Sequence, residues 1–137
     1  MDEQISNQQA FAEKVVWITG ASGGIGEEMA VAFARAGSKL VLSARNQKKL
    51  ECVRDRCFEA GADHGSMLVL PLDVVDLDAM PGAVNKVMEK YSKIDLLINN
   101  AGVGVRDFCT DIKIGVYRTA LEVNLIGPIA LTKQVLP

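Results

Sequence analysis

The 137-residue sequence has few of the side chains from which metal centres and disulfide frameworks are built. It contains one histidine, His64, and three cysteines, Cys52, Cys57 and Cys109, which show no C-x-x-C spacing. We therefore predict no metal site, and the odd number of cysteines indicates reduced thiols, as in a cytosolic protein. His64 lies in a polar, glycine-rich segment, which favours a solvated loop residue over a catalytic base.

A strong charge imbalance and long apolar runs are also lacking. The formal net charge is −2, from 15 basic and 17 acidic residues, so no basic stripe for nucleic acid is expected. No apolar segment has the length of a signal peptide or membrane anchor, which predicts a cytoplasmic protein; a missing anchor upstream would make it membrane-associated. The 49% of hydrophobic residues suffices for one domain over residues 13–137, after a polar lead-in over residues 1–12.

Short apolar segments alternate with segments of helical periodicity along this domain. Predicted strands cover residues 15–19, 39–43, 67–72 and 94–98, and the unbroken apolar run of the first predicts a strand buried on both faces. Predicted helices cover residues 24–36, 46–61, a segment from about Pro81 onward, and 114–136, the last interrupted at Gly127-Pro128. The apolar residues at helical spacing in the first of these are Ile25, Met29, Phe33 and Ala36. The residues expected to face inward in the third are Met80, Val84, Val87, Met88 and Tyr91. Strands separated by helices predict βαβ units with parallel pairing. The predicted fold class is therefore α/β, a doubly wound parallel Rossmann-type sheet.

A glycine-rich loop, Thr19-Gly20-Ala21-Ser22-Gly23-Gly24-Ile25-Gly26, joins the first strand to the first helix. Glycines let the backbone turn sharply and let a phosphate approach it, and the helix N-terminus attracts an anion. The loop is thus interpreted as a pyrophosphate site, with the alternative that it is only a turn that starts the helix. The residues predicted to bind the cofactor here are Thr19, Gly20, Ser22, Gly24, Ile25 and Gly26.

The end of the second strand indicates which dinucleotide is preferred. In NAD-binding folds an acidic residue near this point accepts hydrogen bonds from the adenosine ribose. Here the strand ends at Ser43-Ala44-Arg45, without an acid. Because an arginine pairs well with a 2′-phosphate, Arg45 favours NADP over NAD. The alternative is that Arg45 is a solvated surface residue beside Lys48 and Lys49.

Together with the loop, three later motifs resemble those of the short-chain dehydrogenase/reductase family. Asp73-Val74 resembles its adenine contact, Asn99-Asn100-Ala101-Gly102 its N-N-A-G motif, and Asn124 the asparagine of its catalytic tetrad. The resemblance implies the strand order 3-2-1-4 and a role for Asn124 in holding a proton-relay water. The further cofactor contacts that it implies are Asp73, Val74, Asn100, Ala101 and Gly102.

The resemblance also implies a reaction. It points to an NADP-dependent oxidoreductase that transfers hydride between the nicotinamide and a carbonyl or secondary alcohol of a small-molecule substrate. Within the family, the segments Val16-Trp17-Ile18-Thr19, Leu42-Ser43-Ala44-Arg45 and Leu131-Thr132-Lys133 resemble the membrane-associated dehydrogenase/reductase member 7 group. Substrates of that group include retinoids and steroids.

The sequence departs from the family at its acid–base residues. The family's chemistry needs a serine and a Tyr-x-x-x-Lys pair, but Tyr91 is followed four residues later by Asp95, and Tyr117 by Leu121. Both tyrosines are interpreted as packing residues. We expect the cofactor-binding half of a larger domain, truncated after four strands at Pro137. The alternative is a catalytically silent nucleotide-binding or dimerising fragment, with the helix over 114–136 as the contact between two copies.

Overall fold

The computed structural model describes residues 9–136, in which strands and helices alternate. The strands are β1 (Val15–Thr19), β2 (Lys39–Ser43), β3 (Met67–Val69) and β4 (Leu96–Ile98). The helices are α2 (Gly24–Arg35), α3 (Gln47–Glu59), α4 (Met80–Tyr91), α5 (Ile114–Leu121) and α6 (Gly127–Val135). Short helical turns are η1 (His64–Ser66), η2 (Leu77–Ala79) and η3 (Glu122–Ile126).

The four strands form one parallel sheet in the order β3-β2-β1-β4. In its register, Val16 of β1 lies between Leu40 of β2 and Leu96 of β4. The predicted fold class and strand order are confirmed. In a sheet wound in this order, segments that follow the carboxyl ends of neighbouring strands meet at one edge.

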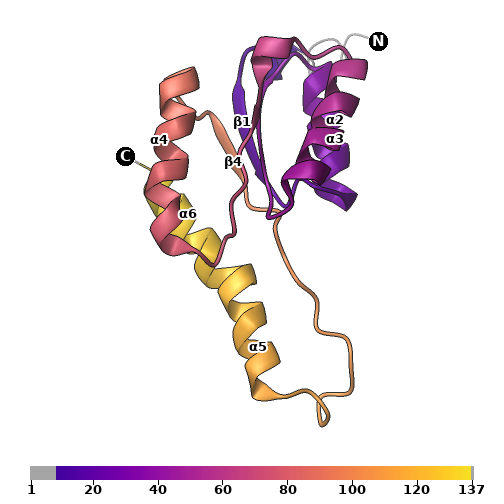
Figure 1. Ribbon diagram of the computed structural model, residues 1–137, viewed down its shortest axis with the longest axis vertical. Helices are drawn as coiled ribbons and strands as arrows, with labels where there is room; N and C mark the ends of the chain where they lie inside the picture. The colour runs from indigo at the N-terminus through magenta and orange to yellow at the C-terminus, as the bar shows by residue number, and fades with distance from the viewer. Residues whose placement is uncertain (1–8, 137) are drawn as a thin grey trace.

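Successive strand residues face opposite sides of the sheet, so each side has its own core. Val16 and Ile18 pack with α2 and α3, whereas Val15 and Trp17 pack with α4 and α6. Figure 1 shows the pair α2 and α3 on one side and the pair α4 and α6 on the other. β1 is buried on both faces, as its unbroken apolar sequence predicted.

The buried face of α2 differs from the predicted one. Periodicity placed Ile25, Met29 and Phe33 inward, but Ile25 is 74% exposed, and Met29 and Phe33 only border the core. The residues that face the sheet are smaller and begin one position later in the sequence than the predicted ones: Gly26, Ala30, Val31 and Ala34. Small residues let a helix lie close to the sheet beside a glycine-rich loop, and this close approach outweighs the larger apolar stripe.

β3 and β4 are shorter than predicted, although the backbone pairing continues beyond them. The N–H groups of Leu70 and Leu72 donate to the carbonyls of Leu42 (2.9 Å) and Ala44 (3.0 Å). Before β4, the carboxylate of Asp95 accepts a hydrogen bond from the Val15 N–H (2.8 Å). This bond, reinforced by Lys93, holds the pKa of Asp95 below its usual range.

The helix predicted over residues 114–136 is divided in three. The turn η3 is π-helical, with the Gly127 N–H donating to the Glu122 carbonyl, and Pro128 occupies the first turn of α6. Figure 1 shows α6 beside α4, whereas α5 extends away from the sheet. Residues 99–113 form a long connection from the end of β4 to the start of α5. None of the helices described over residues 9–136 is long and apolar enough to cross a membrane.

Candidate nucleotide-binding site

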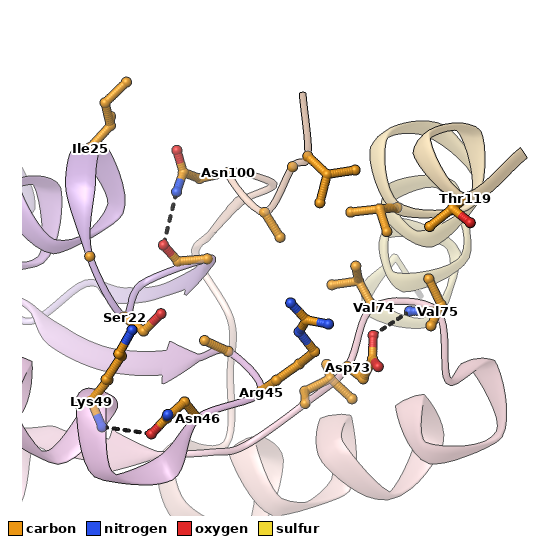
Figure 2. Close-up of a pocket in the computed structure, with 18 residues that line it drawn as sticks. Ser22, Ile25, Arg45, Asn46, Lys49, Asp73, Val74, Val75, Asn100 and Thr119 are labelled. Atoms are coloured by element: carbon orange, nitrogen blue, oxygen red, sulfur yellow. Dashed lines mark hydrogen bonds between the residues drawn. The ribbon is translucent and has the colours of Figure 1, made fainter. Parts of the chain in front are cut away.

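A cleft of about 1100 Å³ lies at the carboxyl ends of the strands. Figure 2 shows its lining, contributed by the glycine-rich loop, the segments after β2, β3 and β4, and the far wall at α5 and η3. Predicted cofactor-binding residues that line it are Gly20, Ser22, Ile25, Arg45, Asp73, Val74, Asn100, Ala101 and Gly102. Three further residues that were predicted to bind the cofactor do not line the cleft and lie behind or beside its surface: Thr19, Gly24 and Gly26.

The loop turns where two glycines leave no space for a side chain. Gly20 has φ +64°, and a Cβ there would lie 2.8 Å from the Cα of Ala101. A Cβ on Gly26 would lie 2.6 Å from Nδ2 of Asn100 and closer still to the Gly20 carbonyl oxygen. The loop, the start of α2 and the segment after β4 are therefore packed backbone against backbone, which leaves Ser22 and Gly23 at the cleft surface.

Thr19 is buried and serves this packing rather than the cleft. Its hydroxyl oxygen accepts hydrogen bonds from the N–H groups of Asn100 and Ala101, both at 3.1 Å. The side chain of Asn100 in turn donates to the Gly20 carbonyl (3.2 Å). Asn99 points the other way and donates to the hydroxyl of Thr132 on α6 (3.1 Å). These bonds fix the N-N-A-G segment against the loop.

Two cationic side chains border the cleft after β2. Arg45 is exposed, and Figure 2 shows its guanidinium directed into the open space. Asn46 caps α3, because its side chain accepts from the Lys49 N–H (3.0 Å). The long side chain of Lys49 extends from the first turn of α3 toward Ser22 (Figure 2). No acidic residue stands at the end of β2, as the sequence already showed.

Asp73 is the acidic residue of the cleft lining. Its carboxylate accepts a hydrogen bond from the Val75 N–H (3.1 Å), which stabilises the turn after β3. Val74 is buried, and Val75 lines the cleft beside it. Asp73 and Arg45 form no ion pair within residues 9–136, so both side chains retain free hydrogen-bonding positions toward the cleft.

Asn124 lies in the π-helical turn η3 and makes a two-point contact with the backbone. Its side-chain oxygen accepts from the Val103 N–H, and its amide donates to the Val103 carbonyl, both at 2.8 Å. The side chain thus holds the start of the 103–113 connection against η3. The role in holding a proton-relay water, which the resemblance implied, stays a prediction.

Other residues singled out in the sequence lie away from the cleft. His64 is exposed and contacts Phe58, with ring centroids 4.3 Å apart and the rings tilted at 41°. Tyr91 contributes to the core on the α4 side, and the hydroxyl of Tyr117 donates to Sγ of Cys109 (3.5 Å). Within residues 9–136, no group of three or more His, Cys, Asp or Glu side chains is placed to hold a metal ion.

Several lining residues were not predicted from the sequence. Ala44 follows one predicted strand and Leu72 ends another, so their place was readable in retrospect, whereas Thr119 of α5 and Val123 of η3 belong to a helical segment that follows no strand end directly. Lys49 carried a signal in the sequence, because it stands in the first turn of the predicted helix that begins directly after Arg45. The unpredicted lining residues are Gly23, Ala44, Asn46, Lys49, Leu72, Val75, Val103, Thr119 and Val123.

A parallel sheet of this order, with a glycine-rich loop and a cleft at the strand ends, is typical of nucleotide-binding Rossmann-type domains. Residues 14–137 match the family model described as short chain dehydrogenase. The chain is 45% identical over 128 residues to human dehydrogenase/reductase SDR family member 7, covering 93% of this chain and 38% of that protein. It therefore belongs to the short-chain dehydrogenase/reductase family, and it spans about two fifths of the length of that relative.

Solved structures of similar proteins include complexes with both nicotinamide cofactors. A metagenomic short-chain oxidoreductase in complex with NADP has a TM-score of 0.84 and 29% identity, over 93% of this chain and 57% of that one. The 3-ketoacyl-(acyl-carrier-protein) reductase of Brucella melitensis, complexed with NADH, has a TM-score of 0.84 and 30% identity, over 93% of this chain and 50% of that one. Nicotinamide cofactors are thus bound by structural neighbours of the chain.

Proposed function

We propose that the cleft binds NADP(H), and that the chain supplies the cofactor-binding part of an oxidoreductase. The observation that carries the choice of NADP is Arg45, whose guanidinium enters the cleft where NAD-binding folds place an acid. Membership of the family supports the reaction type, and the neighbour that holds NADP supports the cofactor class.

The residues of the cleft fit a dinucleotide. A side chain at Gly20 or Gly26 would fill the space in which the loop turns, and Ser22 and Gly23 lie at the surface that a pyrophosphate would meet. We infer that Asp73 and Val74 hold the adenine ring and that Asn100 to Gly102 border the cofactor ribose, an assignment supported by their place in the cleft lining. When bound, the nicotinamide supplies the hydride chemistry, and the chain positions it.

For the substrate we propose a carbonyl or secondary alcohol on a retinoid, steroid or similar lipid. This rests on the resemblance to the dehydrogenase/reductase member 7 group, which the 45% identity supports. An assay of the whole protein with a panel of retinoid, steroid and short-chain carbonyl compounds tests it. Turnover of the short-chain compounds alone would refute the lipid assignment.

The cofactor proposal is tested by titrating NADPH and NADH into the chain and into Arg45→Ala. A charge-assisted contact with the 2′-phosphate contributes about 1.5–3 kcal/mol, so Arg45→Ala should weaken NADPH roughly ten- to hundredfold and NADH little. Arg35→Ala, an exposed arginine at the far end of α2, is the control. Equal affinities for NADPH and NADH in the unaltered chain would refute the proposal.

The 137-residue chain by itself is expected to bind the cofactor without turnover. It has no Tyr-x-x-x-Lys pair, and positioned acid–base groups contribute about 10²- to 10⁴-fold to such reactions. Purified chain incubated with NADPH and a range of carbonyl compounds should oxidise NADPH at the background rate. Robust oxidation would show that other residues of the chain transfer the proton.

A catalytically silent binding or dimerising role is the second candidate. It is favoured by the missing pair together with the exposed apolar side chains of α5 and η3, which include Ile114, Leu121 and Leu125. Cofactor binding without activity in any longer form of the protein would support this candidate. Activity in a form that contains Tyr-x-x-x-Lys would support the oxidoreductase.

A further inference from the structure

The cleft wall formed by the glycine-rich loop and α3 contains a second cation besides Arg45. Lys49 is exposed in the first turn of α3, and both it and Ser22 line the cleft. Figure 2 shows the Lys49 side chain extending toward Ser22, while Arg45 enters the cleft from the end of β2. The two cations therefore line the same cleft from different elements.

Neither cation is engaged elsewhere in the described chain. The ion pairs within residues 9–136 involve the cations Lys39, Arg54, Arg56 and Lys93, and exclude Arg45 and Lys49. The carboxylate of the cleft lining, Asp73, accepts a backbone hydrogen bond and pairs with neither cation. Two positive charges thus border one cleft with a single carboxylate in its lining.

The position of Lys49 does not benefit the fold. The first turn of α3 contains no acidic residue and carries Lys48 and Lys49, although the positive end of a helix dipole disfavours cations there. The side chain of Asn46 caps the helix by accepting from the Lys49 N–H, a role that the ammonium group of Lys49 cannot fill because it only donates hydrogen bonds. A bound anion would offset the unfavourable charge at this helix end.

We propose that Lys49, assisted by the Ser22 hydroxyl, binds the ribose 2′-phosphate of NADP(H) from the side opposite Arg45. This inference rests on the proposed function, because it assigns a second specificity-determining residue to the same site. Arg45 and Lys49 then act on one phosphate, and the preference for a phosphorylated ribose belongs to the pair rather than to Arg45 alone.

The test compares Lys49→Met with Lys48→Met, which removes a neighbouring exposed charge from α3 outside the cleft lining. The ligands are NADPH, NADH, 2′,5′-ADP and 5′-AMP, titrated at fixed salt because exposed ion pairs are screened. Lys49→Met should weaken NADPH and 2′,5′-ADP about three- to tenfold and leave NADH and 5′-AMP within twofold. Lys48→Met should leave all four affinities within twofold.

A double variant, Arg45→Ala with Lys49→Met, tests whether the two cations act on the same phosphate. If they do, the losses of NADPH affinity should be non-additive, because each cation positions the phosphate for the other. Far-UV circular dichroism and the fluorescence of the buried Trp17 verify that each variant is folded.

The outcomes separate this inference from the proposed function. If the unaltered chain prefers NADPH and Arg45→Ala abolishes the preference, but Lys49→Met changes no affinity or weakens NADPH and NADH equally, the role of Lys49 is refuted and the NADP assignment stands. If the unaltered chain shows no preference for NADPH, both are refuted.

Discussion

Single residues of the glycine-rich loop serve different purposes. Gly26 is required by packing, since a Cβ there would meet Nδ2 of Asn100 at 2.6 Å and the Gly20 carbonyl more closely. Gly23 has an extended backbone, and a Cβ there would meet nothing within 4 Å. The loop therefore contains glycines that its packing requires, Gly20 and Gly26, and one that packing does not require, Gly23.

We predict that Gly26→Ala destabilises the chain and abolishes cofactor binding, because backbone must shift to accept the methyl group. Overpacking of this kind costs about 1–3 kcal/mol. Gly23→Ala is the matched control for packing and should retain wild-type stability, because a methyl group there meets nothing within 4 Å. Urea unfolding followed by Trp17 fluorescence, with NADPH titration, measures both effects. Wild-type stability in Gly26→Ala would contradict the observed packing.

Cys57 gives the chain a predicted dependence of stability on alkaline pH. Burial raises the pKa of Cys57 from 9.0 to about 11. Below pH 9 the thiol is protonated in both states, so its contribution is fully present. Between pH 9 and 11 the unfolded thiol ionises first, and the free energy of unfolding should fall by up to about 1.4 kcal/mol per pH unit.

Urea unfolding at several pH values between 8 and 11 measures this decrease. Cys57→Ala should remove the part that begins near pH 9, whereas the exposed Cys52, replaced by alanine, should leave it unchanged. Burial also raises the pKa of Tyr91 to about 12, so a further loss is expected above pH 10 in the same direction. An identical slope between pH 9 and 10 in Cys57→Ala would contradict the assignment to Cys57.

Residues of the cleft were predictable where they follow a strand in the sequence. Arg45, Asp73 and Asn100 each stand just beyond a strand end, and parallel pairing brings such positions to one edge. Thr119 and Val123 were not predictable, since they lie in α5 and η3, which follow no strand end directly. For Thr19 the sequence motif was recognised, but the residue does not line the cleft. Its hydroxyl oxygen accepts hydrogen bonds from backbone N–H groups instead.

At the scale of elements, η3 couples the far wall of the cleft to the segment after β4. Asn124 makes both contacts to Val103, and each neutral hydrogen bond of this kind contributes about 0.5–1.5 kcal/mol. We predict that Asn124→Ala raises the hydrogen-exchange rate of the Val103 N–H roughly fivefold, which corresponds to about 1 kcal/mol. Asn124→Asp retains the acceptor and should preserve most of this protection. Unchanged protection in Asn124→Ala would show that the connection is held by other contacts.

The elements also show what periodicity can predict. β1 and β2 have the predicted bounds because continuous apolar runs mark strands buried on both faces. The predicted inward face of α2 was wrong by one position, because the helix lies close to the loop and buries the small residues Gly26 and Ala30 rather than Ile25. Met88 of α4 was predicted to face inward but is 42% exposed. The face of α4 that packs against the core is already filled by Met80, Ala83 and Val87.

The whole molecule has apolar surface concentrated at one end. α5 extends away from the sheet (Figure 1), and its exposed side chains include Ile114, at 71% exposure, and Leu121, at 55%. Leu125 and Ile126 continue this surface into η3, and Leu96 is exposed on β4, which pairs with β1 alone. Exposed apolar patches and open strand edges both favour association with other chains.

We therefore predict that the 137-residue chain self-associates, through α5 and η3 above all. Leu121→Glu combined with Leu125→Glu should shift the chain toward the monomer in size-exclusion chromatography with light scattering. Ile25→Glu is the matched control: Ile25 is 74% exposed, yet it stands alone in the glycine-rich loop, so its replacement should leave the assembly unchanged.

Hydrogen exchange locates the contact, because amides of residues 114–126 should gain protection at higher protein concentration, whereas those of β4 gain it only if the strand edge associates. A monodisperse monomer, with β4 protected at all concentrations, would show that this apolar surface is tolerated in water and that the described residues form an independent binding domain.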